Sequence, residues 1–394
     1  MTDSKVKDIL LLVRSAVTGE KIALPEDFDI SGVLGIAKSH QVAGLVYYGA
    51  LNCGVDNALP EMQELFMLVC NTIVISQQQM YEIERLANAF DQNGIDYMLL
   101  KGSILRKLYP KIEMRIMGDA DILIKIEQYD KISSVMKSLA FEEVVESDHE
   151  LIWKKQSLLV ELHKRLIPSY NKDYHAYYGD GWQLGKPNAN KPNSFEMTAE
   201  DQMIYLFTHF AKHYRDGGIG IRHFTDLFVY KNANKNMNES YINGELEKLC
   251  LYEFYYNICD TIAVWFEGKE STDKTDFITA VILRSGVYGK HDYVNIAQTL
   301  RTAKLSNDTK NAKLKRLRIM VFPSLKTMKL HYPCLKKVPV LLPIFWIVRA
   351  FDILINKRKK AVQFYSDIKK VTEKDIIDYD EALQYVGLDF NFKE

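Results

Sequence analysis

Two aspartates and a nearby glycine–serine pair are the residues whose spacing most directly suggests chemistry. Asp119 and Asp121 stand two residues apart at the start of the apolar run ADILIKI. Because the side chains of a strand alternate between its two faces, both carboxylates are expected to point the same way. Lys101-Gly102-Ser103 precedes them. Two converging carboxylates beside a Gly-Ser turn form a cradle for metal-bound phosphates, so this stretch predicts nucleotidyl transfer.

The two aspartates are expected to bind divalent metal. Carboxylate oxygens are hard ligands that select Mg²⁺ or Mn²⁺ over zinc. Two ions ~3.5–4 Å apart clamp both the attacking and the leaving oxygen of a phosphoryl transfer. An ordinary turn is the alternative for Asp119-Ala120-Asp121. That alternative fits poorly, because ILIK follows directly and makes this the start of a buried strand.

The phosphates of a nucleotide are expected on the glycine–serine side. Gly102 would let a phosphate approach the backbone closely, since it has no Cβ. Ser103 is expected at a helix N-terminus, where free N–H groups and the helix dipole favour an anion. Lys101 or Arg115 would neutralise the phosphate charge.

A third carboxylate comes from the run LLVELHKRL at 158–166. Alternation along a strand places Glu161, His163 and Arg165 on one face. Glu161 is predicted to be the remaining metal ligand, or the base that takes the proton from an acceptor hydroxyl. His163 would orient it or contact phosphate. A cross-strand salt bridge of Glu161 with Arg165, or a solvated face, is the alternative.

Two histidines, His209 and His213, follow at positions i and i+4 of a predicted helix that Thr198 caps and that runs to Arg215. This spacing can bind zinc, but the glutamate of the zinc motif H-E-x-x-H is absent. A face that contacts phosphate or base together with Lys212 is the preferred functional interpretation. A plain polar helix face is the alternative.

Arg222 and Asp226 are also spaced i and i+4. They form either a simple ion pair along a helix or part of the same pocket.

The segments around these residues predict a small mixed sheet with helices. Strands are expected at 95–100, 120–126, 142–145, 150–154 and 158–166, and helices at 103–108 and 129–139. The order strand, helix, strand, helix and then an antiparallel set describes an α+β core. Residues 169–195 are expected to be loop-like.

The length of 394 residues predicts two or three domains, or one elaborated domain, at ~100–200 residues per domain. We expect four regions: an N-terminal helical region at 1–90, the sheet core at 91–168, a helical region that completes the pocket at 169–300, and a C-terminal helical tail at 301–394.

Charge and cysteine content restrict the partners and the compartment. Lys+Arg and Asp+Glu are equal at 51 each, so no DNA partner is expected, because non-specific polyanion binding needs a basic excess. The five cysteines are scattered without a CxxC pair, and the first residues lack a signal-peptide pattern. Both features predict a reduced, cytoplasmic protein.

One apolar segment, VPVLLPIFWIVRAFDILI at 338–355, has nearly the length of a membrane span. Arg349 and Asp352 lie inside it, and each would cost ~2.5–3.5 kcal/mol at the centre of a membrane helix. The segment is therefore expected to be a buried core helix, and membrane contact is not expected.

The central stretch LLKGSILRKLYPKIEMRIMGDADILIK resembles the core motif of bacterial nucleotidyltransferase-like proteins in the DNA polymerase β-type superfamily. The pattern of that family falls on Lys101, Gly102, Leu105, Tyr109, Pro110, Arg115, Asp119 and Asp121. VELHKRL, THFAKH, RHFTDL and the apolar C-terminal segment are similar to its later motifs. The chain departs from the pattern in having Glu161 where Asp is commoner and a slightly longer gap, 104–118, before Asp119.

This resemblance implies a polymerase β-like nucleotidyltransferase core flanked by N- and C-terminal helical regions. It also implies transfer of a nucleoside monophosphate from an NTP to an unidentified acceptor, with two Mg²⁺ or Mn²⁺ ions and release of pyrophosphate. The acceptor would be a small molecule, a protein or RNA. A catalytically inactive nucleotide-binding or interaction module is one alternative, and the intact carboxylate set argues against it. A toxin-like enzyme acting on tRNA or protein is another, and the neutral charge gives no support for tRNA.

Overall fold

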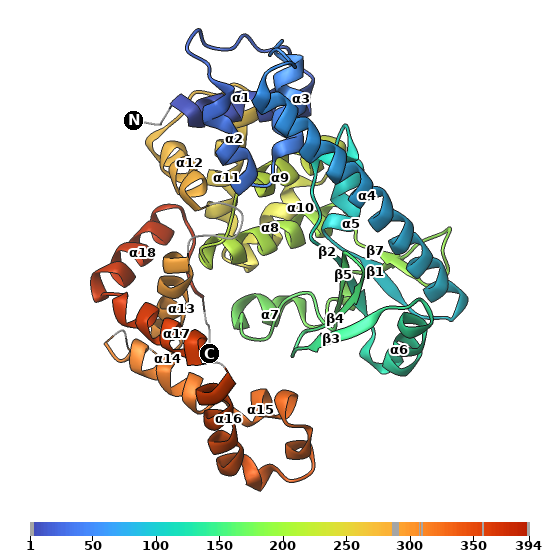
Figure 1. Cartoon of the computed structure of the whole chain (residues 1–394), viewed down its shortest axis with the longest axis vertical. Helices are drawn as coiled ribbons and strands as arrows, with labels where there is room; N and C mark the ends of the chain where they lie inside the picture. The colour runs from blue at the N-terminus through green and yellow to red at the C-terminus, as the bar shows by residue number, and fades with distance from the viewer. Residues whose placement is uncertain (1–3, 286–290, 307, 309, 357, 392–394) are drawn as a thin grey trace.

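The computed structural model describes residues 4–285, 291–306, 308, 310–356 and 358–391. Its N-terminal part consists of helices, as expected from the sequence: α1 (Ser4–Thr18), α2 (Ile30–Ser39), α3 (Ala43–Asn52) and α4 (Pro60–Gln92). The long helix α4 begins with a proline in its first turn, where no backbone N–H is needed. It is followed by Gly94, whose φ of 62° lies in the left-handed region that glycine adopts readily. Helix α4 runs along the sheet (Figure 1).

The sheet has seven strands in the order β3-β4-β5-β2-β1-β7-β6. Its strands are β1 (Tyr97–Leu99), β2 (Asp119–Ile124), β3 (Glu142–Glu146), β4 (Glu150–Lys155), β5 (Leu158–His163), β6 (Lys186–Pro187) and β7 (Ser194–Glu196). Strands β2 and β5 are parallel, as are β1 and β7, and the remaining neighbours are antiparallel. The predicted α+β class with a mixed sheet is thereby confirmed.

Alternation along β2 separates a packing face from a polar face. Ala120, Ile122 and Ile124 are buried in a core cluster with side chains of α4 and of α6 (Tyr129–Ser138). Asp119 and Asp121 therefore point to the opposite side of the sheet. Burying each of the two isoleucines contributes roughly 1.5–3 kcal/mol, so the packing face determines which side the carboxylates occupy.

The expectation of a loop over 169–195 is wrong in part. The segment contains α7 (Lys172–Tyr178) and strand β6, and β7 begins at its end. Strand β7 has three residues and pairs with β1, which lies about a hundred residues earlier in the chain. So short a strand has no detectable periodicity and exists because the edge of β1 is available for pairing.

The second half of the described chain is helical. Helix α8 (Ala199–Arg215) has the predicted cap, since the Thr198 side chain accepts a hydrogen bond from the backbone N–H of Asp201. It is followed by α9 (Ile221–Ala233), α10 (Glu239–Lys248), α11 (Tyr252–Phe266), α12 (Asp273–Ser285), α13 (His291–Ser306), α14 (Ala312–Val321), α15 (Leu325–His331), α16 (Leu342–Asn356), α17 (Arg358–Lys370) and α18 (Glu373–Tyr385).

The apolar segment 338–355 is not a buried core helix, so that prediction is wrong. It forms a 3₁₀ turn at Pro339–Leu341 followed by α16, and α16 lies at one end of the long axis of the molecule (Figure 1). Several of its apolar side chains are exposed, because few elements of the described chain lie beyond it. Among the described residues, no helix combines the length and the apolar character needed to cross a membrane.

Candidate active site

A cavity of about 550 Å³ lies against the polar face of the sheet and is closed by α8 and α9. Nine of the ten predicted site residues line it: Lys101, Gly102, Arg115, Asp119, Asp121, Glu161, His163, His209 and His213. The tenth, Ser103, is not among the lining residues. Its side chain is buried, and its Oγ has no hydrogen-bond partner among the described residues. Ser103 is the second residue of α5 (Gly102–Leu105), a helix of only four residues.

The carboxylates come together through the pairing of β2 with β5. The parallel register aligns Asp121 with Glu161, and alternation carries His163 to the same face. Asp121, Glu161 and His163 each present one ligand atom, and these atoms lie within 4.8 Å of one another. This is a geometry in which a cation can be held by oxygen and nitrogen ligands.

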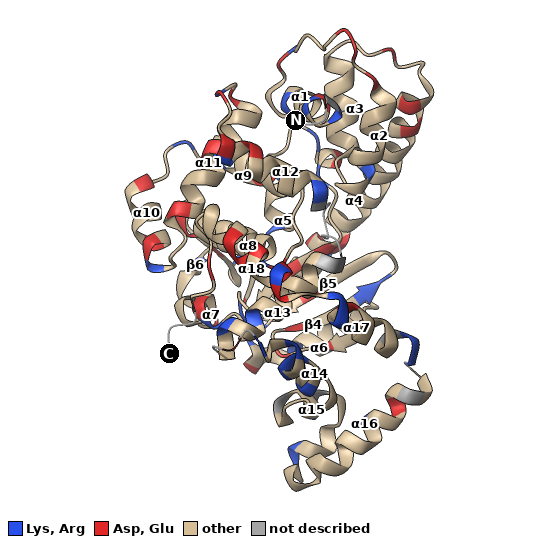
Figure 2. Cartoon of the chain, turned by 90° about the vertical axis from the view of Figure 1, so that its left-hand side faces the viewer, with Lys and Arg blue, Asp and Glu red and all other residues tan. Residues whose placement is uncertain are grey.

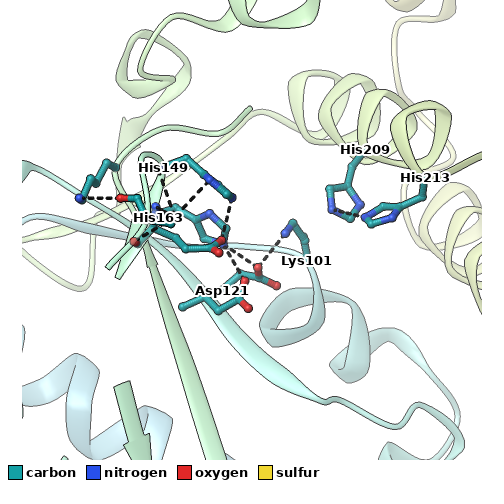
Figure 3. Close-up of polar contacts among 10 residues, drawn as sticks. Lys101, Asp121, His149, His163, His209 and His213 are labelled. Carbon is teal, nitrogen blue, oxygen red and sulfur yellow. Dashed lines mark hydrogen bonds and ion pairs between the residues drawn. The ribbon is translucent and has the colours of Figure 1, made fainter. Parts of the chain in front are cut away.

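Asp121 lies at the centre of the site. Its Oδ1 accepts hydrogen bonds from Lys101 Nζ and from His163 Nε2, both at 2.7 Å (Figure 3). Burial disfavours the charged carboxylate, but Lys101 and His163 outweigh burial and hold the pKa of Asp121 below its usual range. Burial also lowers the pKa of His163, so the imidazole is neutral and donates from Nε2. Asp121 is therefore an anion.

Lys101 reaches Asp121 from a strained backbone. Its φ of 41° and ψ of −110° are uncommon for any residue other than glycine. Such strain costs on the order of 1–3 kcal/mol and is typical of functional positions. The strained turn directly follows β1, where the backbone N–H of Leu100 donates to the carbonyl of Asp121 at 3.0 Å. The turn thus places the Lys101 ammonium in contact with the Asp121 carboxylate.

The other two carboxylates, Asp119 and Glu161, hold their protons more tightly than usual. Burial and the neighbouring Asp119 raise the pKa of Glu161 to about 8. Burial and Asp121 likewise raise the pKa of Asp119. Lys101 and, at Asp119, Arg222 offset only part of the repulsion among the three carboxylates, and a divalent cation is the natural means of relieving the rest. The three carboxylates offer hard oxygen ligands, which fit Mg²⁺ or Mn²⁺, whereas His163 offers a nitrogen.

The opposite wall of the cavity is built by α8 and the start of α9. His209 and His213 lie one helical turn apart with their Nε2 atoms at 3.1 Å, across the site from Lys101 (Figure 3). The ring of His223 lies 6.1 Å from that of His213. Burial lowers the pKa of all three histidines, and burial together with the nearby Lys101 lowers the pKa of Lys212 to about 8. This wall offers N–H donors that match an anion.

Arg115 has a structural partner. Its Nε and Nη2 donate to the two oxygens of Asp226 on α9, at 2.7 and 3.0 Å, and Tyr109 donates to the same carboxylate at 2.7 Å. A Cβ at Gly102 would lie 2.9 Å from Nη1 of Arg115 and 2.9 Å from Cγ of Met117. Gly102 thus makes room for the protein's own side chains, and its predicted contact with a phosphate remains a prediction.

Several lining residues were missed by the sequence analysis. His149 and Glu150 at the start of β4, Tyr170 after β5, and His223 on α9 all line the cavity. The register of the β4–β5 hairpin places Glu150 opposite His163. Pairing the residues on either side of the turn at 156–157 would have predicted this neighbour from the sequence. His223 has no such signal, because its place depends on how α9 packs against α8.

Comparisons with known proteins give one family. The model of a family described as "Uncharacterised nucleotidyltransferase" matches residues 26–267. No curated protein matches the chain. The solution structure of the antibiotic-resistance factor ANT(2'')-Ia aligns with 46% of this chain and 95% of its own, at 11% identity and a TM-score of 0.34. Similarity of that degree does not define a shared fold.

Proposed function

The chain belongs to the uncharacterised nucleotidyltransferase family, and from this premise we propose that it moves a nucleoside monophosphate from an NTP to an acceptor hydroxyl and releases pyrophosphate. The observation that carries the proposal is the convergence of Asp119, Asp121 and Glu161 on one wall of a cavity whose other wall carries histidine and lysine N–H donors. Phosphoryl transfer needs metal-binding carboxylates beside groups that neutralise phosphate charge.

The carboxylates are the groups that would hold the metal. Asp119, Asp121 and Glu161 would bind Mg²⁺ or Mn²⁺, in keeping with two ions, and the metal supplies charge neutralisation for the attacking and leaving oxygens when it is bound. The raised pKa of Glu161 supports this assignment, because it reflects repulsion that a cation would relieve.

The other residues of the site would orient the carboxylates and neutralise the charge of the phosphates. His163 holds Asp121 in place through Nε2. Glu161 would accept the proton of the acceptor hydroxyl. Lys101, and the wall formed by His209 and His213, would contact the phosphates of the nucleotide. Both cations predicted to neutralise phosphate are paired with a carboxylate, Arg115 with Asp226 and Lys101 with Asp121. We prefer Lys101, because its partner is one of the carboxylates that would hold the metal.

We also propose that the chain divides into four regions, 1–90, 91–168, 169–300 and 301–394, with β6 and β7 extending the sheet of the second region past residue 168. A cytoplasmic location fits the free cysteines. The acceptor is a small molecule, a protein or RNA.

The purified chain, incubated with each NTP and Mg²⁺ in the presence of a cell extract, tests the proposal. We expect pyrophosphate release with one or more NTPs, loss of release with EDTA, and recovery when Mg²⁺ is restored. Fractionation of the extract into small molecules, protein and RNA, followed by mass spectrometry, identifies the modified acceptor. NTP binding without metal dependence and without pyrophosphate release would instead support the inactive nucleotide-binding module.

Replacing both histidines of α8 tests the phosphate wall. In His209→Ala combined with His213→Ala, we expect the KM for the NTP to rise roughly tenfold with kcat little changed, since each lost hydrogen bond costs about 0.5–1.5 kcal/mol. His331→Ala, on α15, is the matched control and should leave KM unchanged. Steady-state kinetics separate the outcomes, and a fall in kcat at constant KM would place the pair at the chemical step instead.

A further inference from the structure

One face of α16 is apolar and exposed. The residues on it follow the spacing i, i+3, i+4, i+7 and i+11, which places them along a single side of the helix. They are Ile344, Ile347, Val348, Phe351 and Ile355, and each is between 45% and 76% exposed. A contiguous apolar stripe of this kind indicates an interaction surface, unlike single exposed apolar residues.

The opposite face of α16 is fixed to the rest of the chain. Trp346 donates from Nε1 to the carbonyl oxygen of Pro323 at 2.9 Å. Arg349 donates from Nη1 to the carbonyl oxygen of Met320 at 2.6 Å. These contacts hold the helix so that its apolar stripe points away from the protein. Arg349 thus faces the packed side of α16, so its charge is not on the apolar stripe.

The region around α16 is strongly basic in a chain that is neutral overall. Between residues 310 and 360 the only acidic residue is Asp352. The same segment contains fourteen basic residues: Lys310, Lys313, Lys315, Arg316, Arg318, Lys326, Lys329, Lys336, Lys337, Arg349, Lys357, Arg358, Lys359 and Lys360. Of these, Arg316 is buried and Arg349 faces the packed side, so neither is counted toward the contact with a partner. Figure 2 shows Lys and Arg along α14 and α17. Basic residues thus flank the apolar helix at both ends.

We propose that α16 binds the surface of an anionic lipid bilayer. The apolar stripe would enter the boundary between headgroups and acyl chains, and the flanking lysines and arginines would contact anionic headgroups. The helix has 15 residues and is therefore ~22 Å long, shorter than a hydrocarbon core of ~30 Å. It lies in the plane of the membrane surface and does not span it.

Other occupants fit the surface less well. A second copy of the chain, seated on the same stripe, would bring two strongly basic segments together, and like charges at an interface are unfavourable. RNA matches the charge, but four of the five stripe residues are aliphatic and give bases no aromatic surface for stacking. An anionic bilayer accommodates both the apolar stripe and the basic flanks.

Vesicle flotation with the full chain tests this inference. We expect the protein to float with phosphatidylcholine vesicles that contain phosphatidylglycerol and not with phosphatidylcholine alone. The bound fraction should fall as NaCl is raised, because salt screens the contribution of the basic flanks. Equal binding to both kinds of vesicle, or to neither, would overturn the proposal.

Two variants separate the apolar and the charged contributions. Ile347→Glu with Phe351→Glu, and separately Lys336→Glu with Lys337→Glu, should each lower partitioning into anionic vesicles at least roughly tenfold. Val74→Glu is the matched control, because Val74 is an exposed valine on α4, and it should float like the wild type. Circular dichroism checks that each variant is folded.

The same variants also show whether a second copy of the chain, and not a membrane, covers the stripe. If Ile347→Glu with Phe351→Glu converts a dimer to a monomer in sedimentation velocity while the wild type does not bind vesicles, the stripe is an interface between copies. Wild-type flotation by the Phe351 and Lys336 variants would equally refute the membrane role. Neither readout depends on nucleotidyl transfer, so failure here leaves the proposed function untouched.

Discussion

Asp121→Asn is expected to reduce kcat for nucleotidyl transfer by about a thousandfold. Asp121 supplies the carboxylate that lies between Lys101 and His163 and beside Glu161. Asparagine keeps the shape but removes the negative charge and presents an N–H₂ group to a metal. A metal ion contributes several kcal/mol to transition-state stabilisation, and ~4 kcal/mol corresponds to about three orders of magnitude in rate.

Pyrophosphate release at saturating NTP measures this effect. Asp96→Asn is the matched control, because Asp96 pairs with Lys125 at 2.7 Å and does not line the cavity. We expect it to retain the wild-type rate. The Asp121 variant should remain folded, since Asp119 and Glu161 still compensate the charge of Lys101. A folded Asp121→Asn variant with the rate of the wild type would place the chemistry elsewhere.

Asp226→Ala is expected to lower the free energy of unfolding by about 3–5 kcal/mol, the usual cost of removing one partner of a buried ion pair. The Arg115–Asp226 pair is almost completely buried, with side chains only 8% and 10% exposed. Alanine would leave the guanidinium of Arg115 and the hydroxyl of Tyr109 without their shared acceptor. Urea denaturation followed by circular dichroism measures the loss as a lower midpoint.

Two further variants distinguish this mechanism from general damage. Asp260→Ala removes an exposed ion pair with Lys269 and should cost less than about 1 kcal/mol. Replacing both partners, Arg115→Met with Asp226→Leu, should recover much of the lost stability, because no uncompensated charge remains. Equal losses in the Asp226 and Asp260 variants would show that burial of the pair is energetically unimportant.

The regular periodicity of strands and helices explains which features could be predicted from the sequence. Period-two alternation correctly placed Asp119 with Asp121, and Glu161 with His163, each pair on one face of its strand. The capped helix that starts after Thr198 and the strands at 142–145, 150–154 and 158–166 were likewise predicted within a few residues. These features depend on neighbouring residues alone.

The errors concern properties that local patterns do not contain. An apolar segment such as 338–355 has the composition of a core helix, but burial depends on whether other elements cover it. Arg115 has the charge that phosphate needs, yet its Nε and Nη2 donate to Asp226, more than a hundred residues away. Strand β7 is too short to be recognised without its partner.

The sequence by itself determined which residue types face the same side of each element, because strand and helix geometry follow from the covalent backbone. It thereby predicted a carboxylate site and the α+β class. Only the tertiary structure decided that β5 lies beside β2, which brings Glu161 to Asp121 across forty residues of chain. It also decided that His209, His213 and His223 close the cavity, and that α16 is exposed. These arrangements arise from burial of distant apolar faces and from pairing of strand edges, which act between segments far apart in the sequence.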